Sequence, residues 1–160
     1  MKITISIIIF LVSLQCFAQE NSIKIYNPDA DAETELIKAI EQAQKYNKHV
    51  FIQLGGNWCS WCIKFHKFVK ENHDLDSIIN ANYIVLKINY SREKQNTEIF
   101  EKFEYPQRFG FPVFVILDST GKRIHTQNSG LLEKDKSYDI KKVKYFFLNW
   151  TAKAIDPEQY

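Results

Sequence analysis

The chain has few cysteines, no long apolar run and no large excess of charge of either sign, and each scarcity excludes a class of protein. Only three of its 160 residues are cysteine, too few for a small fold held together by several disulfides. The formal net charge of +2, with 25% charged residues, indicates an ordinary mixed surface and no nucleic-acid partner. Internal repeats, low-complexity tracts and long linkers are absent, and the 45% hydrophobic content predicts one domain with a real core.

The most apolar stretch lies at the N-terminus. Lys2 precedes an apolar stretch from Ile3 to Leu14, and Cys16 and Ala18 are small residues where a signal peptidase reads the chain. This pattern is typical of a secretory signal peptide. A stretch of about twelve residues is shorter than the ~20 needed for a permanent membrane span. We therefore predict a signal peptide over residues 1–18 and an exported protein, periplasmic or secreted, without a membrane span.

Cleavage there would leave residues 19–160 as a single domain with two cysteines, Cys59 and Cys62. An exported domain that has only one short-range pair of thiols is not a disulfide-stapled scaffold. The alternative to cleavage after residue 18 is a lipid anchor on Cys16, although Gln15 stands where a lipoprotein signal has a small residue.

The two thiols are separated by two residues, so a disulfide between them needs almost no backbone movement. The apolar run from His49 to Leu54 predicts a buried strand that ends in a flexible Gly-Gly turn, and a helical pattern follows from about 59 to 72. Cys59 then stands at a helix N-terminus, where free N–H groups and the helix dipole favour a thiolate. We expect Cys59 to meet solvent and Cys62, one turn further in, to be more shielded.

The remaining patterns give the order α, β, α, β, α, β, β, α, which predicts an α/β fold. Helices are expected over about 29–47, 59–72, 91–104 and from about 137 onward, with short helical turns within 74–80. Strands are expected over 49–54, 83–89, 111–117 and 122–127, and the most loop-like stretch is 130–137. The last helix would bury apolar residues at helical spacing, namely Val143, Phe146, Phe147 and Trp150.

Two segments together resemble the thioredoxin fold, over about Asp29 to Trp150. They are Gly55-Gly56-Asn57-Trp58-Cys59-Ser60-Trp61-Cys62 and, some fifty residues later, Gly110-Phe111-Pro112-Val113. The first is most similar to exported thioredoxin-like domains with the signature Gly-Gly-x-Trp-Cys-x-Trp-Cys. The resemblance implies a central mixed sheet of four to five strands flanked by helices on both faces.

The resemblance also implies roles for individual residues. Cys59 would be the attacking cysteine and Cys62 the resolving one, with no cofactor and no metal. Pro112 would follow a cis peptide bond facing the pair and leave the backbone of Phe111 free to bind an extended substrate segment. Trp58 would shield the thiols, and Trp61 would be either an apolar platform for the substrate or part of the helix packing.

One position departs from the family pattern. Thioredoxins usually bury an acid six residues before the first cysteine, as proton acceptor for the second thiol, and this chain has Gln53 there. A neutral amide cannot take that proton, so water or the surroundings of Lys64 and His66 would have to serve. The residues between the cysteines do not fix the direction of exchange.

The prediction from these observations is an exported thiol-disulfide oxidoreductase that exchanges disulfides with protein substrates, with a preference for reduction. A membrane-linked or soluble redox partner would recharge the pair. The alternatives are a disulfide oxidase or isomerase, a purely structural disulfide, and a non-catalytic binding module or copper chaperone. In the last case Cys59, Cys62 and His66 would be the metal ligands.

Overall fold

The computed structural model describes residues 23–160, so the predicted signal peptide and Cys16 lie outside the described residues. Four strands form a mixed sheet, namely β1 (His49–Gly55), β2 (Tyr83–Asn89), β3 (Val113–Leu117) and β4 (Arg123–Asn128). Their order in the sheet is β2-β1-β3-β4. Strand β1 pairs in parallel with β2 and antiparallel with β3, and β4 is antiparallel to β3. The central strand β1 is buried along its whole length, because helices cover both faces of the sheet.

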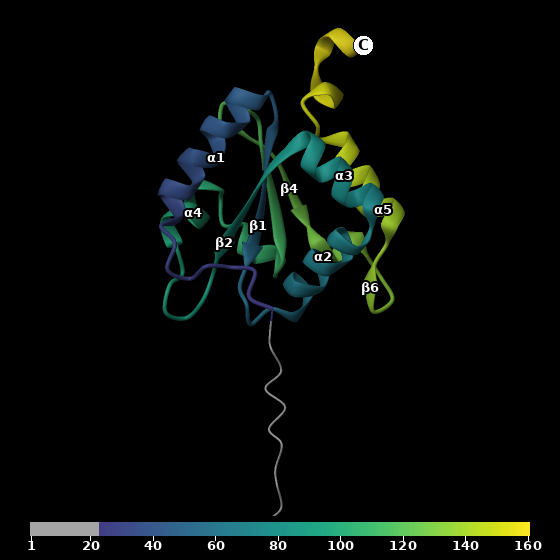
Figure 1. The fold of residues 1–160 in the computed structure, drawn as a ribbon. Helices are drawn as coiled ribbons and strands as arrows, with labels where there is room; N and C mark the ends of the chain where they lie inside the picture. Colours follow the sequence, from purple (N-terminus) through teal and green to yellow (C-terminus); the bar gives the residue numbers. More distant parts are fainter. Residues whose placement is uncertain (1–22) are drawn as a thin grey trace, which may run out of the picture.

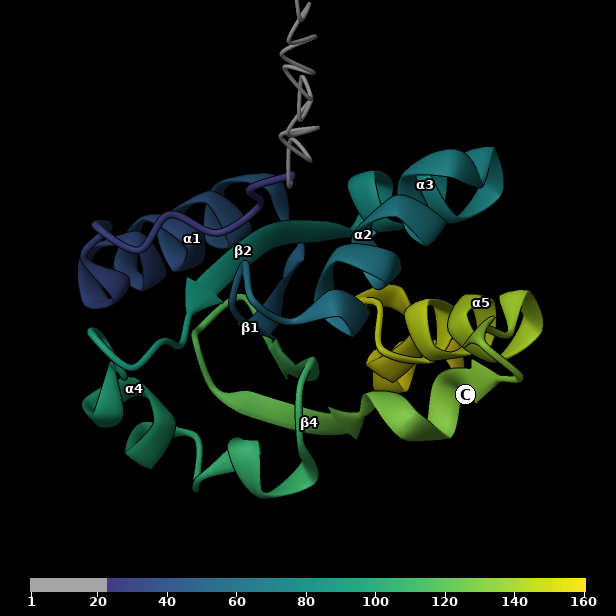
Figure 2. The same ribbon diagram turned by 90° about the horizontal axis from the view of Figure 1, so that it is seen from below.

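The helices divide into two layers. They are α1 (Ala32–Tyr46), α2 (Ser60–Glu71), α3 (His73–Asn82), α4 (Thr97–Lys102) and α5 (Ile140–Asn149). Figures 1 and 2 show α1 and α4 on one side of the sheet and α2, α3 and α5 on the other. Short 3-10 helices span Pro106–Phe109, Ser129–Leu132, Lys153–Ile155 and Pro157–Gln159. No helix within residues 23–160 has the length and apolar character needed to cross a bilayer.

Alternation along β1 places its side chains in two separate cores. Val50, Ile52 and Leu54 pack with α1 and α4, whereas Phe51 packs with α2, α3 and α5. On the second side, the ring centroids of Phe65 and Phe114 are 4.3 Å apart and those of Phe51 and Phe114 are 5.2 Å apart. Full burial of such a side chain contributes about 2 kcal/mol. Because Phe65 follows Cys62 by three residues, this aromatic cluster fixes the cysteine helix on the sheet.

The architecture confirms the predicted α/β fold with a mixed sheet and helices on both faces. The largest difference in the first half of the chain is at 74–80, where the sequence predicts short turns and a ten-residue helix is present. Asp74 and Asp76 lie in its first turn, where carboxylates stabilise a helix. The predicted helix over 91–104 is wrong in extent, because only Thr97–Lys102 is α-helical.

The expected loop over 130–137 contains a short antiparallel pair, β5 (Glu133–Lys134) and β6 (Ser137–Tyr138). Two-residue strands are too short to show a period in sequence. The last helix therefore begins at Ile140 rather than near 137, with the Asp139 carboxylate accepting hydrogen bonds from the amides of Lys141 and Lys142. At its end Trp150 is only partly buried, packs against the core and stacks on His125 at 4.1 Å.

Candidate active site

Cys59 is the N-cap of α2. Its backbone is extended, with φ −88° and ψ 101°, and its sulfur accepts a hydrogen bond from the amide of Cys62 at 3.1 Å. The two cysteines form a disulfide with their Cα atoms 5.2 Å apart. No acidic residue lies in the first turn of this twelve-residue helix, so nothing there opposes a negative charge on the capping sulfur. The N–H groups and the helix dipole favour that charge.

The cysteines are covered more completely than the sequence predicts. Cys62 is fully buried, as predicted for the inner residue, but only 5% of Cys59 is exposed. The expectation that Cys59 meets solvent openly is therefore wrong. The physical reason is tertiary packing, since Tyr26 is clustered with both cysteines and Trp61 and Phe111 lie against them.

The two residues before Asn57 must be glycines because neighbouring atoms leave no space for a side chain at either position. A Cβ on Gly55 would overlap the sulfur of Cys62 and lie 2.7 Å from the hydroxyl oxygen of Tyr26. A Cβ on Gly56 would overlap the indole of Trp58 and lie 2.7 Å from a backbone carbonyl oxygen. The expected flexible turn is thus wrong for the first glycine. Gly55 is the last residue of β1, and its missing side chain lets the cysteine helix approach the strand.

The segment before β3 lies beside the cysteine pair. The Phe111–Pro112 peptide bond is cis, and the preceding Gly110 has φ +84°, a conformation that side chains disfavour. The ring of Phe111 packs against the cysteine cluster. It also meets the indole of Trp58 edge-on, with centroids 5.6 Å apart, and the ring of Tyr90 at 4.9 Å.

The two tryptophans of the motif have different surroundings. Trp58 is 60% exposed, and its indole nitrogen donates to the carbonyl of Tyr90 at 2.6 Å. Trp61 is partly buried and packs edge-on against Tyr138, with an ammonium group, that of Lys64, 4.2 Å from the centre of its ring. Of the two, Trp58 therefore offers the larger accessible apolar surface.

An open groove runs along the exposed tryptophan. Its volume is about 580 Å³, and it is lined by Trp58, Tyr90, Ser91, Arg92 and Glu93. The groove has an apolar wall and charged residues of both signs.

Three polar residues, Gln53, Asn57 and Tyr26, surround the cysteine pair through hydrogen bonds, and the sequence assigns no site role to Asn57 and Tyr26. Gln53 is buried, and its amide nitrogen donates to the Tyr26 hydroxyl at 2.8 Å and to the carbonyl of Cys62 at 3.1 Å. Asn57 holds the segment that carries Tyr26: its side-chain oxygen accepts from the amides of Ile25 and Tyr26, and its nitrogen donates to the Tyr26 carbonyl. No local pattern marks Tyr26, because its partners lie 27 to 31 residues away.

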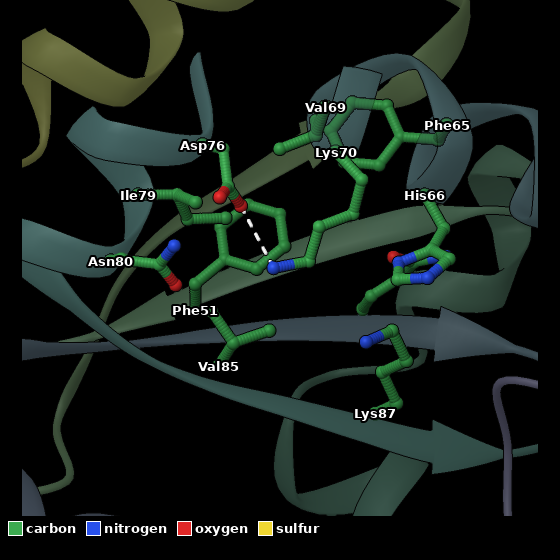
Figure 3. Close-up of a pocket in the computed structure, with 11 residues that line it drawn as sticks. Phe51, Phe65, His66, Val69, Lys70, Asp76, Ile79, Asn80, Val85 and Lys87 are labelled. Carbon is green, nitrogen blue, oxygen red and sulfur yellow. Dashed lines mark hydrogen bonds and ion pairs between the residues drawn. The ribbon is translucent and has the colours of Figure 1, made fainter. Parts of the chain in front are cut away.

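A pocket of about 150 Å³ lies between strands β1 and β2 and helices α2 and α3. Figure 3 shows its apolar lining, an ion pair between Lys70 and Asp76 at 2.8 Å, and the neighbouring His66 and Lys87. Gln53 also lines it, so the pocket reaches the residue that is bonded to the Cys62 carbonyl.

The two basic residues suggested as proton acceptors therefore differ. His66 lines this pocket, whereas the Lys64 ammonium donates to the carbonyl of Lys136, elsewhere on the surface. Loss of hydration lowers the pKa of His66, and the neighbouring charges of Lys87 and Lys70 lower it further. A neutral imidazole is thus favoured in the pocket.

Lys87 is predicted to lower stability at neutral pH. Burial lowers its pKa from the ordinary 10.5, with repulsion from Lys70 as a second cause, and none of the ion pairs within residues 23–160 includes it. The folded state therefore disfavours the ammonium form. This penalty is complete below the folded pKa and disappears as the pH rises towards 10.5. Lys87→Met should raise the melting temperature by a few degrees at pH 7.

The gain should shrink as the pH approaches 10.5, which thermal melts at several pH values would measure. Lys67→Met is the matched control, because Lys67 is exposed on α2; it should give no pH-dependent gain. A Lys87→Met gain that stays constant with pH would show that packing, not the charge, is responsible.

The described residues contain no cluster of potential metal ligands. Within 23–160 no cluster of three His, Cys, Asp or Glu side chains is placed to hold an ion. His66 lines the pocket between α2, α3 and the sheet, and it is not grouped with Cys59 and Cys62 as a set of three ligands.

Comparison with known proteins agrees with the fold. A disulphide isomerase from Xylella fastidiosa Temecula1 is 26% identical, with a TM-score of 0.71 over 79% of this chain and 96% of that one. The DsbH oxidoreductase is 17% identical, with a TM-score of 0.54 over 71% and 81% of the two chains, and shows the fold alone. No curated protein sequence matched. The family model described as a thioredoxin-like domain matches residues 36–143, so the chain belongs to the thioredoxin-like domain family.

Proposed function

We propose that this protein is a thiol-disulfide oxidoreductase in which Cys59 attacks and Cys62 resolves. The observation that carries the proposal is the capping geometry. The sulfur of Cys59 closes the N-terminus of α2 and accepts the amide hydrogen of Cys62, while the second sulfur is bonded to it from one turn inside the helix. The family supplies the scaffold, and this geometry supports the assignment of an attacking thiol at the helix N-terminus and a resolving thiol one turn further in.

In the reducing direction, the Cys59 thiolate attacks one sulfur of a substrate disulfide. A bond forms between Cys59 and that sulfur, and the other substrate sulfur leaves as a thiolate. The Cys62 thiolate then attacks Cys59, which releases the second substrate thiolate and closes the Cys59–Cys62 disulfide. The substrate gains two electrons and the protein loses two, so a dithiol or a membrane-linked donor must return them. Oxidation of a substrate is the same sequence in reverse.

The substrate surface in this proposal is formed by Trp58, Trp61, Phe111 and Pro112. Trp58 and Phe111 form an edge-on aromatic pair beside the cysteines, and the open groove adjoins Trp58. An extended substrate backbone would pair with the segment before β3 while its side chains lie on these rings. Trp61, which packs inward on Tyr138, contributes the edge of its ring.

Reduction is the preferred direction, and isomerisation is the second candidate. The specific support for isomerisation is the 26% identity to the Xylella fastidiosa disulphide isomerase over most of both chains. The reduction potential of the pair against glutathione separates the two, because about 30 mV corresponds to ~1.4 kcal/mol for a two-electron couple. Export to the periplasm or the medium remains part of the proposal, with a soluble or membrane-linked redox partner.

Insulin reduction tests the proposed activity. In the presence of dithiothreitol the protein should accelerate the precipitation of reduced insulin well above the rate without protein. The matched control is the double variant Cys59→Ser, Cys62→Ser, which lacks both thiols of the pair and keeps side chains of similar shape. If the wild-type protein gives no acceleration, or the double variant gives the same acceleration, the proposed activity is wrong.

A further inference from the structure

Tyr26 lies directly behind the cysteine pair, although it comes 33 residues before Cys59 in the chain. Only 3% of the residue is exposed, and it forms one cluster with the two cysteines. A Cβ on Gly55 would overlap the sulfur of Cys62 and lie 2.7 Å from the hydroxyl oxygen of Tyr26. Strand β1 therefore leaves open a space in which the hydroxyl and the inner sulfur are neighbours.

Two side chains fix this position. Asn57 makes three hydrogen bonds to the backbone of Ile25 and Tyr26, between 2.8 and 3.0 Å long. Because Asn57 belongs to the loop that leads into the cysteine helix, the hydroxyl is placed relative to the sulfurs by the same loop that places Cys59. Gln53 then holds the hydroxyl itself, with its amide nitrogen 2.8 Å from the hydroxyl oxygen.

The hydrogen bond from Gln53 determines whether the Tyr26 hydroxyl is free to donate or to accept. The amide donates, so the Tyr26 oxygen is the acceptor in that bond and its own proton must point elsewhere. Among the hydrogen bonds of residues 23–160, none has the Tyr26 hydroxyl as donor. The hydroxyl thus has a proton to donate and a sulfur as its neighbour.

We propose that, once the disulfide is reduced, the Tyr26 hydroxyl donates a hydrogen bond to the Cys62 thiolate and thereby makes Cys62 a competent resolving nucleophile. This inference rests on the proposed function and adds a residue to it. Tyr26 acts as a neutral donor and keeps its proton throughout. Burial raises the pKa of Tyr26 far above the ordinary range of a phenol, which agrees with that role.

The proposed hydrogen bond would explain how a buried Cys62 thiolate can form although residue 53 is a neutral amide and not an acid. Cys62 is completely buried, and burial disfavours a thiolate. Gln53 cannot accept its proton, and its only bond to Cys62 goes to the carbonyl oxygen. A donor at the sulfur would offset the cost of burying the charge without requiring an acid nearby. The released proton could leave through the pocket lined by Gln53 and His66.

The direct test is the pKa of Cys62 with and without the hydroxyl. In the full chain carrying C16S and C59A, Cys62 is the single thiol, and its ionisation can be followed by NMR of ¹³Cβ-labelled cysteine. Tyr26→Phe should raise the pKa of Cys62 by about one to two units, the size expected for a hydrogen bond to a charged group. An unchanged pKa would overturn the inference.

Tyr83→Phe is the matched control. Tyr83 is also buried, and its hydroxyl donates to the carbonyl of Phe147 at 2.6 Å, away from the cysteine cluster. It should leave the pKa of Cys62 unchanged. If both phenylalanine variants shift the pKa equally, a general loosening of the core explains the effect and the inference fails.

A kinetic measurement gives a second readout. With both active-site cysteines present, the Cys59–glutathione mixed disulfide should be resolved at least about tenfold more slowly in Tyr26→Phe at pH 7, because the thiolate fraction falls with the raised pKa. The alkylation rate of Cys59 in a C62A background should be the same with Tyr26 or Phe. A slower step at Cys59 alone would contradict the role assigned to Tyr26.

The outcomes separate this inference from the proposed function. Normal insulin reduction with an unshifted Cys62 pKa would overturn only the role of Tyr26, whereas a shifted pKa without insulin reduction would overturn only the enzyme. If Tyr26→Phe does not fold, site-specific 3-fluorotyrosine at residue 26 keeps the shape and makes the hydroxyl a stronger donor. It should then lower the pKa of Cys62, and no change would overturn the inference.

Discussion

Cys59→Ser is expected to lower the rate of insulin reduction by about a thousandfold or more, down to the rate without protein. A serine hydroxyl is not ionised at neutral pH, so the helix N-terminus that favours a thiolate has no nucleophile to stabilise. Groups that act as one catalytic unit typically lose most of their activity when one is removed. The packing should change little, because Cys59 is replaced by a residue of similar shape that also caps helices.

Cys62→Ala is expected to have a different effect. The first attack by Cys59 can still occur, but the mixed disulfide has no resolving thiol and should accumulate. Mass spectrometry of the variant after mixing with an oxidised peptide would show one covalent adduct on Cys59. Cys16→Ser is the control and should behave as the wild type. A stable adduct on Cys62 in Cys59→Ser, together with no adduct on Cys59 in Cys62→Ala, would reverse the assigned roles.

Gly55→Ala is expected to be strongly destabilising. The added Cβ would overlap the Cys62 sulfur and approach the Tyr26 hydroxyl to 2.7 Å, and both atoms belong to packed, buried side chains. Overpacking of this kind costs about 2 to 3 kcal/mol. The melting temperature should fall by on the order of 8 °C, and disulfide exchange should slow because the cysteine helix moves off the strand.

Gly130→Ala is a suitable control for this substitution. Gly130 lies in a short 3-10 helix, and a Cβ there would meet only the side-chain oxygen of Asn128, at 3.2 Å. Its effect should stay within about 0.5 kcal/mol. Thermal melts of the two variants, with insulin reduction measured on each, make the comparison. Equal melting temperatures for the two variants would mean that the space beside Cys62 can adapt.

The fold could be predicted from sequence because local patterns determine most of it. A strand that is buried on both faces has a continuous apolar run, as β1 does. A helix that is buried on one face has apolar residues at helical spacing, as Val143, Phe146 and Phe147 are. The prediction is wrong at Ser137 and Tyr138 because a two-residue strand has no period to detect. It underestimates the helix from 73 to 82 because the apolar face of that helix is small, with only Leu75 and Ile79 buried.

The cysteine pair is also visible in the sequence, since two thiols at this spacing before a helical pattern are typical of a redox site. Its environment is not visible there. The burial of Cys59 depends on Tyr26, Trp61 and Phe111, which the fold brings together from three parts of the chain. In the sequence, Gly55 looks like part of a flexible turn. The structure shows that a glycine is needed there because the Cys62 sulfur occupies the space of a side chain, and sequence alone does not reveal that contact.

The three hydrogen bonds from Asn57 have a practical consequence for protein engineering. They attach residues 25 and 26 to the loop that leads into α2. A fusion partner or affinity handle placed just ahead of Ile25 would therefore disturb the loop that positions Cys59. The C-terminus lies at the opposite end of the molecule (Figure 1). Handles, fluorophores and surface-immobilisation linkers are therefore best attached after Tyr160.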